Sequence, residues 1–268
     1  MKKYPGFFWT GWIIPAALLA AIIPSAYAGD TAGPAASEPF DYAKPALFTG
    51  TVYEAGSQEK KVLFTFERTA TRSNSTVRVE RQFVRPDGLV AATEDIVYES
   101  GRLVSLQMKE FQAKVSGAIQ ISPDPEDPAG QKIYISYGHG LEPARGESRE
   151  LLPDTEVDDT IYPFMLAHWE ELMGGKPVKF HFVSLEWKTV FGFRLVRTGE
   201  SVLNGRTVEQ IKMEPTSRLI AKLVDPLCFT IEKDTPHRVI QYAGRTTPRI
   251  KKGKSWKYLD ADTVFDWK

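Results

Sequence analysis

The sequence has little of what marks a catalytic or disulfide-bonded protein. Its one cysteine, Cys228, cannot form an internal disulfide, so the core must stabilise the fold. There is no G-x-S-x-G nucleophile motif, and Gly138-His139-Gly140 lacks the length and strand-loop-helix context of a phosphate-binding loop. Cys228 lies between Leu227 and Phe229 in an expected strand, which favours a buried, inert thiol.

Metal-ligand spacing is also missing. His168 stands close to Glu170 and Glu171, but the spacing of zinc-protease ligands is absent. No two of the four histidines lie at ligand spacing on one expected element. We therefore assign no catalytic residue, no metal and no cofactor, and we favour a non-enzymatic protein. A hydrolase or isomerase with a site assembled from distant residues is kept as an alternative.

An excess of charge of either sign is absent, because 34 Lys and Arg balance 34 Asp and Glu. This balance argues against nucleic-acid binding and against attraction to anionic lipid headgroups. Beyond the N-terminus there is no apolar run long enough to cross a bilayer.

The N-terminus has the three parts of a secretory signal peptide. Lys2 and Lys3 precede an apolar run from Trp12 to Ile23, and Ala26-Tyr27-Ala28 is a small-x-small cleavage site. Cleavage after Ala28 leaves 32 basic and 34 acidic residues, a net charge of −2, and no stable membrane span. Export without disulfides favours a periplasmic location. Residues 29–45, rich in Gly, Ala, Pro and Ser, are expected to form a flexible leader before a single domain, 46–268.

Residues 46–268 show mostly the signals of short antiparallel strands. Val77, Val79 and Phe83 alternate with polar residues between Ser75 and Arg85, the period of a half-exposed strand. Asn204-Gly205 predicts a type I′ hairpin turn. About ten to twelve strands without βαβ alternation predict a strand-dominated α+β fold. We expect one large curved antiparallel sheet or half-barrel, with helices against its concave face.

Two helices are expected within this sheet protein. Apolar residues from Ile161 to Met173 recur at helical spacing, which predicts one amphipathic helix of about 12 residues. Asp158, Asp159 or Thr160 can cap its start, and Gly174-Gly175 ends it. A short second helix is expected over 218–224, with Leu219, Ile220, Leu223 and Val224 on its apolar face.

Apolar and aromatic side chains are concentrated around the main helix and the hairpin that follows it. Most such residues form ordinary core, but a curved sheet closed by a detachable helix can also hold an apolar ligand. On that hypothesis the cavity-lining residues are Phe164, Met165, His168, Trp169, Met173, Phe180, Phe182, Phe191 and Phe193.

Two stretches carry a family resemblance. HWEELMGGKPVKFHF and VFGFRLVRTGE resemble segments of uncharacterised exported bacterial proteins. With its signal peptide, strand-rich order and mid-chain helix, the chain from residue 46 to 268 resembles the periplasmic lipoprotein-localisation carriers. The resemblance implies a half-barrel that is closed by helices and holds acyl chains. It transfers no individual binding residue.

The favoured hypothesis is therefore a periplasmic protein that binds or carries a lipid or other apolar small molecule. A second hypothesis is a scaffold that binds another cell-envelope protein and has a filled core and an exposed apolar patch.

Overall fold

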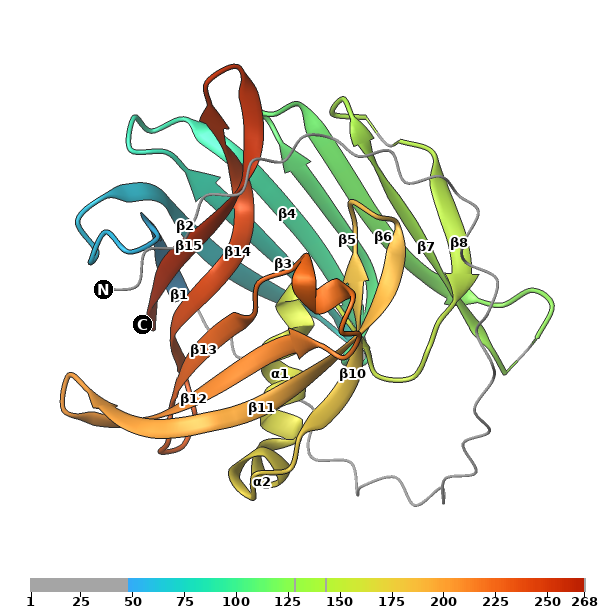
Figure 1. Ribbon diagram of the computed structural model, residues 1–268. Helices are drawn as coiled ribbons and strands as arrows, with labels where there is room; N and C mark the ends of the chain where they lie inside the picture. Colours follow the sequence, from blue (N-terminus) through green and yellow to red (C-terminus); the bar gives the residue numbers. More distant parts are fainter. Residues whose placement is uncertain (1–47, 128, 143, 268) are drawn as a thin grey trace. The chain divides into compact units, whose positions relative to one another are not determined.

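The computed structural model describes residues 48–127, 129–142 and 144–267, all within one compact unit of the chain. The expected signal peptide, 1–28, and leader, 29–45, lie outside these residues. Fifteen strands form a single sheet (Figure 1). The first eight are β1 (Phe48–Glu54), β2 (Val62–Ser73), β3 (Thr76–Val84), β4 (Val90–Glu99), β5 (Arg102–Glu110), β6 (Val115–Pro123), β7 (Gln131–His139) and β8 (Gly146–Glu150).

The other seven strands follow the helical segment or lead into it. They are β9 (Thr155–Glu156), β10 (Val178–Ser184), β11 (Thr189–Leu203), β12 (Arg206–Pro215), β13 (Leu227–Glu232), β14 (Val239–Lys252) and β15 (Ser255–Trp267). The strand order is β8-β7-β6-β5-β4-β3-β2-β1-β15-β14-β13-β12-β11-β10-β9. All pairs are antiparallel except β9 with β10. The expected large antiparallel sheet is confirmed, and its open edges, β8 and β9, are consecutive in the chain.

The alternation in β3 illustrates why these residues form a sheet. Val77, Val79 and Phe83 are buried, whereas Arg78 and Glu80 are exposed, as the period of two predicts. The pairing of β1 with β15, Phe48 opposite Trp267, joins the first and last described strands. The curve of the sheet encloses the helical segment (Figure 1).

The helical segment has three parts: the 3₁₀ turn η1 (Asp158–Thr160), α1 (Ile161–Ala167) and α2 (Trp169–Met173). The expected single helix is thus interrupted at His168, whose backbone leaves the helical region at φ −109° and ψ 20°. Its predicted end is confirmed, since Gly175 adopts φ +77° and Lys176 N–H bonds the carbonyl of Glu171.

The second expected helix, 218–224, forms only in part. Only the 3₁₀ turn η2 (Ile220–Lys222) forms there, and Leu219 and Leu223 are 69% and 45% exposed. A single turn fixes several backbone angles for few hydrogen bonds, so it needs packing that this surface position does not provide. None of the helices in the described ranges has the length and apolarity that crossing a bilayer requires.

Three hydrophobic clusters fill the interior. The first lies mainly on β2 to β7, the second joins α1 and α2 to β10 to β14, and the third lies on β1 to β4 and β15. Leu185 and Val190, at the tip of the β10–β11 hairpin, pack on the first cluster.

Candidate functional site

The nine residues expected to line a cavity lie on the helical segment and the β10–β11 hairpin, and most belong to the second cluster. Phe164, Met165, Trp169, Phe180 and Phe193 are buried. The partly buried members of the set pack against this cluster and are Met173, Phe182 and Phe191. Their side chains fill the space between helix and sheet, and their role toward a ligand stays a prediction.

His168 differs from the other eight because its ring is tied to the helix surface. Its Nδ1 lies 3.0 Å from Glu171 Oε1, and its ring lies 4.6 Å from that of Phe164. It is half-buried and lies at the junction of α1 and α2. This is the geometry of a packed histidine, and within the described ranges no three His, Cys, Asp or Glu side chains gather as metal ligands.

The β13–β14 turn also holds the helical segment. The ring of His237 stacks on Trp169 at 4.2 Å between centroids, and Tyr162 donates its hydroxyl hydrogen to the carbonyl of His237 at 3.0 Å. A stacked pair of this kind adds about 0.5–1.5 kcal/mol to the burial of the rings. The ring that stacks on Trp169 thus belongs to a histidine 68 residues later in the chain.

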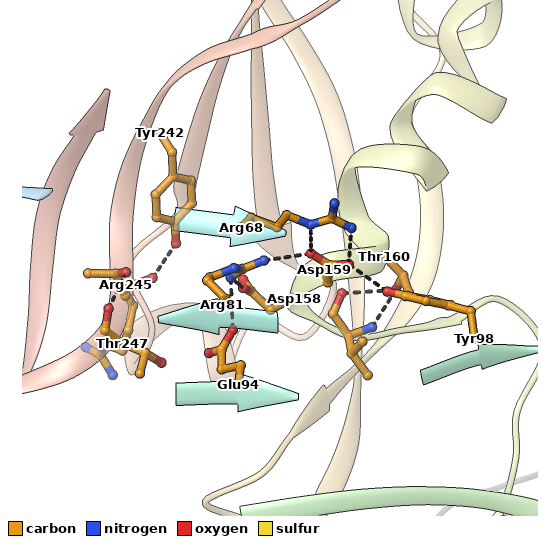
Figure 2. A network of polar contacts seen from close by, with 12 residues as sticks. Arg68, Arg81, Glu94, Tyr98, Asp158, Asp159, Thr160, Tyr242, Arg245 and Thr247 are labelled. Carbon is orange, nitrogen blue, oxygen red and sulfur yellow. Dashed lines mark hydrogen bonds and ion pairs between the residues drawn. The ribbon is translucent and has the colours of Figure 1, made fainter. Parts of the chain in front are cut away.

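A buried polar network fastens the start of the helical segment to the other half of the sheet (Figure 2). Arg68 on β2 donates two hydrogen bonds of 2.9 Å to the carboxylate of Asp159. Arg81 on β3 donates a third at 2.7 Å, and Tyr98 on β4 donates a fourth at 2.8 Å. We call Arg68, Arg81, Glu94, Tyr98 and Asp159 the latch.

Strand register brings the latch together. Arg68 lies opposite Arg81, and Arg81 lies opposite Glu94, so three charged side chains form a row across β2, β3 and β4. Arg81 also contacts Glu94 at 3.1 Å and Asp158 at 2.8 Å. Charge-assisted bonds of this type are about twice as strong as neutral ones, and removing one buried partner is costly.

Burial raises the pKa of both latch carboxyls, but the neighbouring donors reverse that effect at Asp159 and not at Glu94. For Asp159, burial opposes ionisation, but Arg68, Arg81 and Tyr98 outweigh it and hold the pKa well below its usual range. For Glu94, burial outweighs the attraction of Arg81 and raises the pKa to about 7. Among the described residues, the carboxylates of Asp158 and Asp159 balance the charges of the Arg68 and Arg81 guanidiniums. A proton on Glu94 therefore leaves these five side chains with no net charge.

Of the three residues expected to cap the start of the helix, Thr160 takes part in the capping box of the 3₁₀ turn, whereas Asp159 does not cap it. No side chain of Asp158 or Asp159 caps the turn; instead Val157 N–H donates to Thr160 Oγ1 at 2.8 Å. Asp159 points into the sheet with its side chain only 4% exposed. The signal that could have revealed the latch is a charged residue in the buried phase of a strand, as Arg81 is between Val79 and Phe83.

A second buried polar group lies at the base of the β14–β15 hairpin. Arg249 donates its backbone N–H to Glu110 at 3.1 Å and places its guanidinium 4.4 Å from the ring centre of Tyr258. Burial raises the pKa of Glu110. Gln112 donates to the carbonyl of Arg249 at 2.6 Å. These contacts join the hairpin to the end of β5.

Comparison with known proteins gives two structures and no family. No protein-family model matches the chain, and a search of curated proteins finds no match. A β-barrel-like protein with a domain of unknown function, DUF1849, from Brucella abortus has a TM-score of 0.39 and 7% identity, over 83% of this chain and 96% of its own. A DUF1329 family protein from Desulfovibrio piger has a TM-score of 0.22 and 12% identity, over 83% of this chain and 82% of its own.

Proposed function

We propose that the protein is exported to the periplasm and binds or carries a lipid or another apolar ligand without catalysing a reaction. In this proposal the helical segment 158–173 is a movable cover over the concave face of β10 to β14. The ligand would take the place of the cover's apolar side chains when the cover moves aside.

One observation carries this proposal: a short, interrupted helix covers an aromatic sheet surface. Helices α1 and α2 have seven and five residues, too few to be stable without tertiary packing. Their buried side chains, Phe164, Met165, Trp169 and Leu172, pack on the apolar face of β10 to β14. Displacing them would uncover a continuous surface of Val, Leu, Ile, Met and Phe side chains.

The attachment of this cover also supports movement. The latch holds its first residues, and Gly174-Gly175 follows its last, with Gly175 in the left-handed region that glycine adopts readily. The cover therefore has a polar attachment at one end and a conformationally permissive one at the other.

Native mass spectrometry of the processed protein, purified from an envelope fraction, tests the proposal directly. A carrier retains lipid through purification and gives adduct masses that organic extraction removes. If repeated preparations carry no adduct and bind no added fatty acid or phospholipid, the carrier proposal is wrong. A scaffold with a filled core then becomes the better explanation.

The substitution Trp169→Ala separates a cover that lines a binding site from one that only fills a core. Removing this buried ring lowers the free energy of unfolding by about 3–5 kcal/mol in either case. If the cover lines the site, lipid retention by the folded variant falls further than stability accounts for. Tyr134→Ala is the control, because Tyr134 is an exposed aromatic residue on β7, outside the second cluster. Unchanged retention by folded Trp169→Ala protein would exclude the lining role.

A further inference from the structure

The tip of the β14–β15 hairpin carries a concentration of positive charge that the balanced composition conceals. Four lysines occur within seven residues, and all four are exposed. These lysines are Lys251, Lys252, Lys254 and Lys257. None of the four forms an ion pair with another described residue.

The hairpin presents this charge at one end of the sheet. Its base is fixed by the contacts of Arg249 with Glu110, Gln112 and Tyr258. Its tip, dark red in Figure 1, extends past the neighbouring strand ends. The lysines therefore lie on a hairpin that is held at its base and extends beyond the sheet, so their charge faces outward.

An apolar pocket of about 300 Å³ opens beside the lysines. It is bounded by β2, the β3–β4 turn, the β5–β6 turn and the hairpin. Its lining is mostly apolar, with basic side chains among the wall residues, which are Leu63, Phe64, Arg85, Pro86, Gln112, Ile250, Lys251 and Trp256.

Exposed apolar side chains flank this pocket on the adjoining turns. Leu89, which follows the β3–β4 turn, is 60% exposed, and Phe111, in the β5–β6 turn, is 38% exposed. Val62, next to the pocket residue Leu63, is also exposed. We call the four lysines, Leu89, Phe111 and Val62 the rim.

We propose that the rim docks on the surface of a lipid bilayer that contains anionic headgroups. Lysines attract the headgroups, and the exposed apolar side chains of Val62, Leu89 and Phe111 enter the interface, the combination that holds peripheral proteins on membranes. Each lysine near such a surface strengthens binding roughly five-fold. The average charge of the chain argued against attraction to anionic lipids, but attraction depends on local charge within about one Debye length, roughly 10 Å at 0.1 M salt.

This proposal does not depend on the cover over β10 to β14. A protein with no apolar ligand could still dock through the rim, and a carrier could bind lipid without it. The two proposals can be refuted independently. Lipid retention tests the cover, whereas vesicle binding tests the rim.

Vesicle flotation tests whether the rim binds membranes. The protein used is the product purified after expression of all 268 residues. Vesicles of phosphatidylcholine alone are compared with vesicles containing about one third phosphatidylglycerol at ~0.1 M salt. The test variant is Lys251→Gln/Lys254→Gln/Lys257→Gln. The control is Lys176→Gln/Lys179→Gln/Lys222→Gln, which removes the same charge from exposed lysines of other turns and strands.

The proposal predicts that the unsubstituted protein floats with anionic vesicles and that the test variant binds at least ten-fold more weakly. The control variant should bind as the unsubstituted protein does, and ~0.5 M salt should weaken binding through screening. Leu89→Ser/Phe111→Ser should reduce the binding that persists in high salt.

Three results would overturn the proposal. One is no binding to anionic vesicles, another is equal binding to both vesicle types, and the third is an equal loss in the two lysine variants. Binding of polyglutamate through the same lysines with no binding of vesicles would show that the rim accepts an acidic polypeptide, and the membrane proposal would be wrong.

Discussion

The two halves of the sheet attach to the helical segment by different forces. Strands β2 to β4 hold its start through the latch, in which buried charges meet one carboxylate, Asp159. Strands β10 to β14 hold its body through an apolar and aromatic surface. Ion pairs are directional and depend on pH, whereas apolar packing is non-directional and depends on fit. The first half therefore positions the helical segment, and the second half packs against its apolar side chains.

The largest expected effect comes from breaking the latch at its centre. Asp159→Ala removes the carboxylate that the buried guanidiniums of Arg68 and Arg81 share. The free energy of unfolding, measured by urea denaturation, should therefore fall by about 3–5 kcal/mol. Asp158→Ala is the control. It also contacts Arg81, but its side chain is 67% exposed, so the cost should stay below about 1 kcal/mol. Equal losses would show that burial does not distinguish the two aspartates.

A smaller loss is expected when the apolar half is weakened. Met165 is fully buried on the inner face of α1, and Met165→Ala should cost about 3 kcal/mol by leaving a cavity. Met173→Ala, at the partly buried end of α2, should cost about 1 kcal/mol. Stability should respond to volume here and not to pH. A strong pH dependence of the Met165→Ala effect would contradict the division between the two halves.

The sequence predicts the sheet better than it predicts the site. Alternation locates β3, and Asn204-Gly205 forms the expected hairpin turn, with positive φ at both residues. Strand β8, Gly146–Glu150, has no buried side chain and so no alternation to detect, and β9 has only two residues. Strands held mainly by backbone hydrogen bonds at a sheet edge leave little trace in the sequence.

The latch shows a different limit. Arg68, Arg81 and Glu94 each stand in the buried phase of a strand, which the sequence reveals as charge where apolar residues are expected. Their meeting with Asp159 depends on strand register and on where the chain returns, 91 residues after Arg68. The local sequence offered a simpler role for Asp159, as a helix cap, and tertiary contacts overrode it.

The smallest expected effect concerns the protonation of Glu94. It tests whether the stability contributed by the latch depends on pH, in contrast to that of the apolar packing on β10 to β14. Burial raises its pKa to about 7 in the folded protein, above the value of about 4.5 for an exposed glutamate. The folded state therefore holds the proton more tightly, so this residue's contribution to stability falls as pH rises from about 5 to 8.

Glu94→Gln imitates the protonated side chain and should remove that fall. Urea denaturation at pH 5, 6, 7 and 8 should show a flatter stability profile for Glu94→Gln and a variant at least as stable as the unsubstituted protein at pH 8. Parallel profiles would mean that Glu94 stays ionised beside Arg81, and the latch would then respond to pH only in acid, where Asp159 becomes protonated.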